Sequence, residues 1–121
     1  MSYNTISKMF DHTTQSNLTK VLYYQKKGQN WNGLTGQDIR ITVKDIAFGL
    51  RSLDIGSGNN VAILSNNTPR WAMSDYGIIC SGAATVSIYP TLIASQIEYI
   101  LNDSESKLVF VENQEQLSKI L

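Results

Sequence analysis

The sequence predicts an α/β fold, in which a partial parallel sheet of three strand–helix units follows a β-hairpin and an amphipathic helix. Three short apolar runs, at residues 60–64, 84–88 and 107–111, are each followed by a segment whose apolar residues have helical spacing. Strands that alternate with helices favour a parallel sheet with right-handed crossovers. A chain of 121 residues can bury one core, so we expect one domain's worth of structure over residues 1–121.

The N-terminal part of the chain predicts a short helix and a hairpin. Residues 4–16 favour a weak, polar helix. The runs "KVLYYQKK" at 20–27 and "NWNGLT" at 30–35 have the composition of strands, and Gly28 lies in the turn between them. We therefore expect an antiparallel pair at an edge of the fold.

The next segment predicts an amphipathic helix. Thr35 is followed by Asp38, a spacing that resembles a capping box. The apolar residues recur on one helical face: Ile39, Val43, Ile46, Ala47, Leu50 and Leu53. The segment "DIGSGNN" at 54–60 ends this helix, because its glycines permit a left-handed turn.

Each strand–helix unit has a start signal for its helix. Thr68 before Pro69 predicts a cap and a first-turn proline for a helix that runs to about residue 82. Ser95 and Glu98 predict a capping box for a helix that ends near residue 104. Residues 114–121 begin a last helix that the end of the chain interrupts.

The helix at 69–82 is apolar on nearly every side. Its apolar residues are Trp71, Ala72, Met73, Tyr76, Ile78, Ile79 and Cys80. Such a helix has to be covered by the sheet on one side and by a second body on another. Because little of the chain remains to provide that cover, we expect a larger body to pack there.

Composition excludes several classes of protein. Ten acidic and ten basic residues balance each other, so no long-range field favours nucleic acid. Cys80 is the only cysteine, which excludes an internal disulfide and predicts a buried structural thiol. No apolar run is long enough for a membrane span, and the start has no signal-peptide pattern. We expect a cytoplasmic protein, either soluble or peripheral at a membrane.

Two features could form a site. The loop "SNNTP" at 65–69 follows a predicted parallel strand and precedes a helix, where open α/β sheets bind ligands and anions. Asn67 and Thr68 are also good capping residues, and we favour that role. Asp75 is a carboxylate on an apolar helix, and we expect it to pair with a backbone group or a base rather than to act in catalysis.

The remaining candidates favour structural roles. His12 lies in a polar segment without metal-ligand spacing, so we expect it to be exposed. Tyr89 closes a strand, and we expect it to pack while its hydroxyl reaches solvent. Tyr23, Tyr24 and Trp31 could stack on a nucleic-acid base, but too few basic residues lie between them.

Three stretches carry a resemblance to a known family. "VAILSNNTPRW", "SGAATVSIYPT" and "QIEYILNDSESKLVFVE" resemble the opening of AMP-forming long-chain acyl-CoA synthetases, in the adenylate-forming superfamily. The resemblance extends over residues 31–112, and the sequence motifs "IYPT" and "EYILNDS" resemble those of enzymes that use fatty acids as substrates. It identifies the chain as the N-terminal portion of a large adenylation (AMP-binding) domain, with no second domain.

The resemblance implies a ligase. A fatty acid and ATP with Mg²⁺ give an acyl-adenylate and pyrophosphate, and coenzyme A then takes the acyl group as a thioester. Such enzymes use a Ser/Thr/Gly-rich loop ending in lysine, an aspartate for the ribose, and a lysine on a mobile C-terminal domain. None of these is in this chain. We therefore expect no catalytic, cofactor-binding or metal-binding residue here, and a chain that alone is inactive and structural.

Four positions differ from the family's usual pattern. Arg70 replaces an acid in the first turn of a helix, where the helix dipole disfavours a cation by up to about 1 kcal/mol. Gly36 stands where an aromatic residue is usual, Asp54 where a helix-ending glycine is usual, and Ser87 where a proline is common. None of the four is a catalytic position, so they indicate a divergent member.

Two other functions remain open. The chain could be a stand-alone interaction module that kept the fold and lost the chemistry, associating through the edges of its sheet. It could also be a small nucleotide-binding protein that uses the loop at 65–69, although a glycine-rich phosphate loop is missing. The sequence does not fix the acyl chain length, the acyl acceptor, the oligomeric state or whether the natural chain ends at Leu121.

Overall fold

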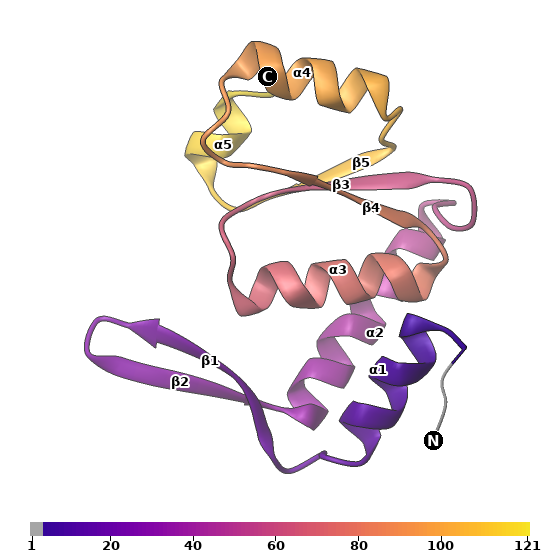
Figure 1. The fold of residues 1–121 in the computed structure, drawn as a ribbon, viewed down its shortest axis with the longest axis vertical. Helices are drawn as coiled ribbons and strands as arrows, with labels where there is room; N and C mark the ends of the chain where they lie inside the picture. The colour runs from indigo at the N-terminus through magenta and orange to yellow at the C-terminus, as the bar shows by residue number, and fades with distance from the viewer. Residues whose placement is uncertain (1–3) are drawn as a thin grey trace.

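The computed structural model describes residues 4–121 and has the predicted α/β architecture (Figure 1). In chain order, the elements are α1 (Ile6–Gln15), β1 (Val21–Lys27), β2 (Asn30–Thr35), α2 (Gly36–Ser52), β3 (Asn60–Leu64), α3 (Pro69–Ser81), β4 (Ala84–Ile88), α4 (Ala94–Asp103), β5 (Leu108–Val111) and α5 (Gln114–Ser118). Helices α4 and α5 lie on one face of the main sheet and α3 lies on the other, with α1 and α2 beyond α3.

The main sheet is parallel and has the order β4-β3-β5. Val61 of the central strand pairs with Thr85 on one side and with Leu108 on the other. The four residues 61–64 are at most 1% exposed, because helices cover both faces of the central strand. Within the described residues, β4 and β5 each pair on one side only, so both outer edges of this sheet are open.

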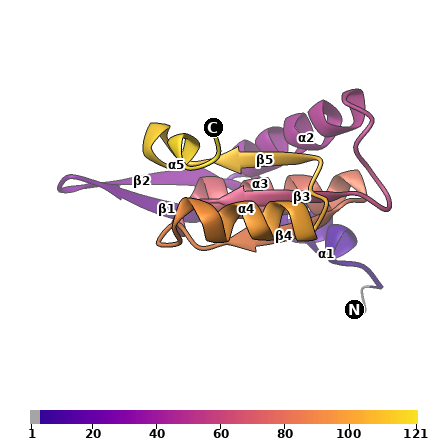
Figure 2. The ribbon, with the colours of Figure 1, turned by 90° about the horizontal axis from the view of Figure 1, so that it is seen from above.

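The predicted hairpin forms a separate two-stranded antiparallel sheet. Lys27 pairs with Asn30 next to the turn, and Gly28 has the positive φ of +63° that such a turn requires. Figure 1 shows the hairpin extending away from the helices, and Figure 2 shows its tip beyond the rest of the fold from a second direction.

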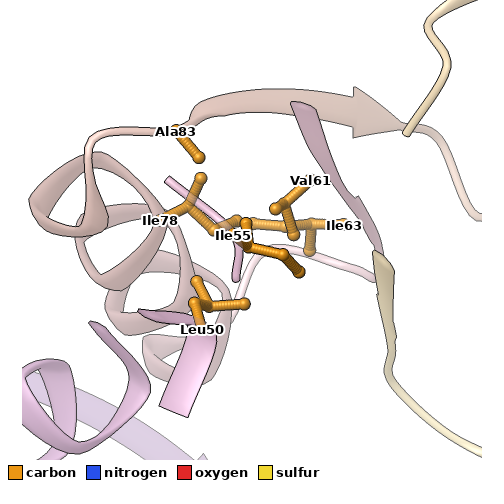
Figure 3. Close-up of a cluster of buried hydrophobic side chains, with 6 residues drawn as sticks. All are labelled: Leu50, Ile55, Val61, Ile63, Ile78 and Ala83. Carbon is orange, nitrogen blue, oxygen red and sulfur yellow. The ribbon is translucent and has the colours of Figure 1, made fainter. Parts of the chain in front are cut away.

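Helix α3 is covered on two sides by elements of this chain, a second cover that the sequence did not predict. On the sheet side, Ile78 belongs to a buried cluster drawn in Figure 3, whose members are Leu50, Ile55, Val61, Ile63, Ile78 and Ala83. On the opposite side, Met73 packs in a second buried cluster with Phe10 of α1 and with Ile39 and Val43 of α2. The hairpin adds three partly buried side chains to this cluster: Leu22, Tyr23 and Leu34. The apolar face predicted for α2 therefore provides most of this second cover.

The helix starts follow the predicted caps in two cases and differ in a third. Thr35 and Asp38 form the full capping box of α2, with hydrogen bonds of 3.2 and 3.0 Å. Thr68 caps α3 through the Trp71 amide. The predicted Ser95 box of α4 is wrong: Ile93 is the N-cap residue, and its amide donates to the Gln96 side chain at 3.2 Å.

The end of α2 depends on an aspartate rather than on the predicted glycines. Asp54 adopts the left-handed conformation with φ of +65°, while Gly58 in the same loop lies four residues further on. The Ile55 amide donates to the Leu50 carbonyl and the Asp54 amide donates to the Arg51 carbonyl, which is the Schellman pattern. Leu53, predicted to lie on the apolar face, is the C-cap residue and is 62% exposed.

The last helix is shorter than predicted. Helix α5 ends at Ser118, and Ile120 beyond it packs against the cluster between the sheet and α4. That cluster is formed by Ala62, Leu64, Ile88 and Ile97. Residues 114–121, predicted to begin one helix, therefore form a short helix and then a turn, after which the Ile120 side chain packs in the core.

Candidate functional site

The loop at 65–69 borders a hollow of about 350 Å³ between the hairpin and the carboxyl end of the sheet. Its lining comes from the inner face of the hairpin, the start of α3 and the ends of β3 and β5: Gln25, Lys27, Ile63, Ser65, Thr68, Arg70, Trp71, Ser74, Phe110, Val111 and Glu112. The position agrees with the general location of ligand sites in open α/β sheets. The hollow is therefore the strongest candidate site among the described residues.

The loop itself is held from the neighbouring strand. Glu112 follows β5, and its Oε2 accepts hydrogen bonds from the Asn66 amide at 3.1 Å and from Asn66 Nδ2 at 3.0 Å. Thr68 Oγ1 accepts from the Trp71 amide at 3.2 Å, which confirms its predicted capping role. Asn67 is exposed and does not line the hollow. The arrangement fixes the loop without using a ligand.

Charge around the hollow is mixed. Lys27 and Arg70 provide two cations and Glu112 provides a carboxylate, while Trp71 and Phe110 provide apolar surface. Arg70 is exposed in the first turn of α3, which forms despite the unfavourable charge. A nucleophile paired with a base is not among the lining residues. Within residues 4–121 no group of three His, Cys, Asp or Glu residues is arranged to hold a metal ion.

Asp75 lies apart from the hollow, near Tyr23. Burial raises the pKa of the Tyr23 hydroxyl above its ordinary value of 10.0, and Tyr76 and the Asp75 carboxylate raise it further. Within the described residues, the Asp75 carboxylate makes neither a hydrogen bond nor an ion pair, so the pairing predicted from the sequence is wrong. Asp75 is only half-buried, and water can provide the solvation that a buried acid would need from a partner.

Cys80 is exposed, which corrects the prediction of a buried thiol. It borders a groove of about 240 Å³ between α1, α2 and α3, together with Phe10, Val43 and Phe48. Partial burial raises the pKa of the Cys80 thiol above 9.0, and the nearby Asp11 carboxylate raises it further. The prediction failed because α3 has apolar residues on every side. Its sequence therefore does not reveal which side chain lies at the edge of the surfaces that pack against the sheet and against α1 and α2.

The other candidates lie on the surface. His12 is exposed, as predicted. Tyr89 is 74% exposed, so the packing predicted for it is wrong, because it lies beyond the last paired residue of β4. Tyr24 and Trp31 are also exposed, and the Lys26 ammonium lies 5.7 Å from the centre of the Trp31 ring. The structure brings none of these residues to the hollow.

Two contacts between distant segments were not predicted. Glu112 holds the loop at 65–69, and its position one residue after a parallel strand was a readable signal, because neighbouring carboxyl ends share one edge of the sheet. Lys119 donates from Nζ to the carbonyls of Pro90 and Leu92 at 2.7 and 3.1 Å. This second contact joins segments almost thirty residues apart, and local sequence gave no sign of it.

Comparison with known proteins connects this geometry to a family. The family model described as AMP-binding enzyme matches residues 10–121. The long-chain-fatty-acid–CoA ligase FadD15 of Mycobacterium bovis is 32% identical over 109 residues, which are 90% of this chain and 18% of the ligase. The long-chain-fatty-acid–CoA ligase ACSBG2 of Xenopus laevis is 31% identical over 117 residues, 97% of this chain and 16% of that protein. The chain thus matches less than a fifth of the length of these curated relatives.

Solved structures show the same fold. A fatty acyl CoA synthetase of Mycobacterium tuberculosis superimposes with a TM-score of 0.84 at 25% identity, over 96% of this chain and 22% of that one. The anthranilate CoA ligase AuaEII in complex with anthranoyl-AMP gives a TM-score of 0.87 at 23% identity, over 98% of this chain and 22% of that one. The hairpin and the three-stranded parallel sheet match the N-terminal portion of such adenylation domains. In the described part of this chain, no helix is long and apolar enough to cross a membrane.

Proposed function

Because this chain belongs to the AMP-binding enzyme family, we propose that it is the N-terminal part of the large adenylation domain of a long-chain fatty acid–CoA ligase. The full-length enzyme joins a fatty acid to ATP with Mg²⁺, forms an acyl-adenylate and releases pyrophosphate. Coenzyme A then takes the acyl group as a thioester and AMP leaves. The enzyme acts in the cytoplasm or at a membrane surface.

The observation that carries this proposal is the family match over residues 10–121, together with ligase relatives that are 31–32% identical. Both relatives named above are long-chain-fatty-acid–CoA ligases, which supports a fatty acid over an aromatic acid as the substrate. The open edges of β4 and β5 are consistent with further strands elsewhere in a longer protein.

The role of this chain within the enzyme is structural. It provides strands and helices that support the adenylation domain, and we expect it to be inactive by itself. Activation of a carboxylate needs donors around the phosphates, where charge develops in the transition state. The hollow beside residues 65–69 has two cations but lacks a glycine-rich loop followed by lysine.

The test is fatty-acid-dependent exchange between ATP and pyrophosphate, followed by acyl-CoA formation, with the natural protein that contains this chain. We expect exchange with palmitate, none with acetate or benzoate, and release of AMP when coenzyme A is present. Residues 1–121 alone should give neither reaction. Activity with benzoate but not palmitate would reject a fatty acid substrate, and exchange by residues 1–121 alone would reject the structural role.

The open sheet edges favour one alternative, a stand-alone module that associates through β4 or β5. That function predicts a concentration-dependent dimer and no exchange activity in the natural protein. If this chain were instead a small protein that binds nucleotides by itself, millimolar ATP or coenzyme A would raise the melting temperature of residues 1–121. An unchanged melting temperature would exclude it.

A further inference from the structure

The hollow at the start of α3 carries an excess of positive charge. Lys27 comes from the hairpin and Arg70 from the first turn of α3, and both are exposed. Within the described residues, neither of these two side chains makes a hydrogen bond or an ion pair. Glu112, the one carboxylate among the described lining residues, already accepts two hydrogen bonds from Asn66 through Oε2. The hollow therefore has two cations without a partner and complements a negative group.

Apolar side chains line the same hollow. Ile63 is 1% exposed, and Trp71 and Phe110 are half-buried and pack against the buried cluster to which Ile63 belongs. A segment that covers these two rings also removes the Arg70 guanidinium from water. A cation that loses its water without gaining a partner is unfavourable. A purely apolar cover is therefore disfavoured, and a cover that brings a carboxylate is favoured.

Arg70 is also an unusual residue for its position in α3. It follows Pro69 in the first turn, where the helix dipole disfavours a cation, and an acid is usual here in the enzymes that the chain resembles. Thr68 caps the helix without any contribution from Arg70. A carboxylate opposite Arg70 offsets the unfavourable charge, and it explains why a basic residue is tolerated where an acid is usual.

The crossovers of the main sheet indicate where a further strand joins it. Helix α3 lies on one face of the sheet, and its crossover leads from β3 to β4. Helix α4 lies on the other face, and its crossover leads in the opposite direction, past β3 to β5. Right-handed crossovers require both directions. Because α5 lies on the same face as α4, a parallel strand that follows α5 has to lie beyond β5, on its open edge.

A strand beyond β5 borders the hollow. Phe110 lies in β5, Glu112 follows it, and both line the hollow. Because the carboxyl ends of parallel strands share one edge of the sheet, the residues that follow the further strand lie on the side of Glu112. Figures 1 and 2 show from two directions that the hairpin and α5 lie on this same side of the fold. The segment that extends the sheet is therefore in a position to cover the hollow.

We propose that the segment that extends the sheet beyond β5 in the natural protein places a carboxylate in the hollow, where it pairs with Arg70. The occupant is a part of the same polypeptide, with an acidic side chain at the carboxyl end of its strand and apolar side chains toward Trp71 and Phe110. The pair connects the start of α3 to the extended sheet, and Lys27 adds attraction from the hairpin. This inference rests on the proposed function, because it requires a chain that continues as an adenylation domain.

Zero-length cross-linking of the natural protein tests the contact. A carbodiimide joins an amine to a carboxylate only where the two are in contact, so Arg70→Lys supplies the amine that the reaction needs. Digestion and mass spectrometry should find position 70 joined to an aspartate or a glutamate beyond residue 121. Arg40→Lys is the matched positive control, because Arg40 Nη1 lies 2.8 Å from Asp11 Oδ1, and it should cross-link to Asp11.

A second variant gives a readout whose direction depends on the partner. Arg70→Glu puts an acid in the first turn of α3, which the helix dipole favours, so without a partner it slows hydrogen exchange of residues 65–74 by up to about fivefold. Opposite a carboxylate it brings two acids together, and exchange becomes faster by about tenfold or more. The control Gln37→Glu puts an acid in the first turn of α2, outside the lining of the hollow, and should slow exchange there in either case.

Two results would overturn the inference. In one, Arg40→Lys cross-links to Asp11, but position 70 is joined to no residue beyond 121 or only to a second copy of the protein. The other is slower hydrogen exchange in Arg70→Glu. Either result in a longer protein that makes acyl-CoA rejects this contact and keeps the ligase. A longer protein that gives the cross-link but no exchange between ATP and pyrophosphate keeps the contact and rejects the ligase.

Discussion

Gly77 of α3 lies against Ile46 of α2 so closely that a Cβ at position 77 would be 2.7 Å from the Ile46 Cβ. This close approach lets α2 cover the side of α3 that faces away from the sheet. Gly77→Ala should therefore lower the free energy of unfolding by about 1–3 kcal/mol, the usual effect of overpacking a core. Urea denaturation followed by circular dichroism measures the change.

Gly49→Ala is the matched control for that experiment. Gly49 lies in the interior of α2, and an added Cβ would meet nothing within 4 Å. Alanine there should raise the free energy of unfolding by about 0.5–1 kcal/mol, because glycine is a poor helix former. If both alanine variants have the same stability, α2 and α3 are not packed as described.

The left-handed residue at the end of α2 gives a second prediction. Asp54 has φ of +65°, and the Leu50 and Ile55 side chains that flank the Schellman motif are both buried. Asp54→Gly should raise the free energy of unfolding by up to about 1 kcal/mol, because glycine adopts this conformation without steric cost. Asp54→Val should lower it. The reverse order in thermal or urea denaturation would show that this turn is not left-handed.

The raised pKa of Tyr23 predicts a pH dependence. Folding raises this pKa above 10.0, so the unfolded chain loses the proton at a lower pH than the folded chain does. The stabilising contribution is complete below pH 10.0 and is lost as the pH rises through the folded pKa. Tyr23→Phe should reduce the alkaline loss of stability, and the exposed Tyr24→Phe should not. Identical alkaline denaturation curves for the two variants would contradict the burial of Tyr23.

Cys80 should react slowly with alkylating reagents despite its exposure. Partial burial and the Asp11 carboxylate raise the thiol pKa above 9.0, which lowers the thiolate fraction near neutral pH. Asp11→Asn should increase the rate of alkylation by iodoacetamide only modestly, because burial is the larger cause of the raised pKa and Arg40 is paired with Asp11 at 2.8 Å. Asp103→Asn on α4 should leave the rate unchanged. Mass spectrometry of time points measures both rates. An unchanged rate in Asp11→Asn would show that the two side chains do not interact.

Local signals predicted most of the fold. Thr35 with Asp38, and Thr68 with Pro69, were found because each cap depends only on residues within one turn. The start of α4 was misplaced because Ile93 is an N-cap residue without a polar side chain, and the nearby Ser95 offered a better local pattern. The start of α4 was therefore predicted wrongly because a second capping pattern, two residues further on, looked better in the sequence than the true start.

Contacts between distant segments were the harder part. The contact between the start of α2 and the turn that follows α1 depends on Gly36, since a Cβ at Gly36 would lie 2.9 Å from the backbone carbonyl carbon of Asn17. The usual aromatic residue cannot occupy this position unless the end of α1 moves. From the sequence, Gly36 was recognised only as a position where an aromatic residue is usual, because its neighbour nineteen residues earlier is set by tertiary structure.

The candidate site was predicted in position but not in detail. The loop at 65–69 lies at the carboxyl end of the sheet, as the alternation of strands and helices predicted. Its attachment to Glu112 was not predicted, because it joins residues 46 positions apart in the sequence. Cys80 and Tyr89 were misplaced because apolar composition shows that a segment is buried on average and not which side chain lies at its margin.

The mass of the natural protein, detected in an extract of its own cells with an antibody against residues 4–121, decides whether this chain is part of a larger ligase. We predict a band several times heavier than 13.5 kDa, as expected if this chain is the N-terminal part of a ligase. A band at 13.5 kDa would contradict it and would favour a module that acts without the adenylation machinery.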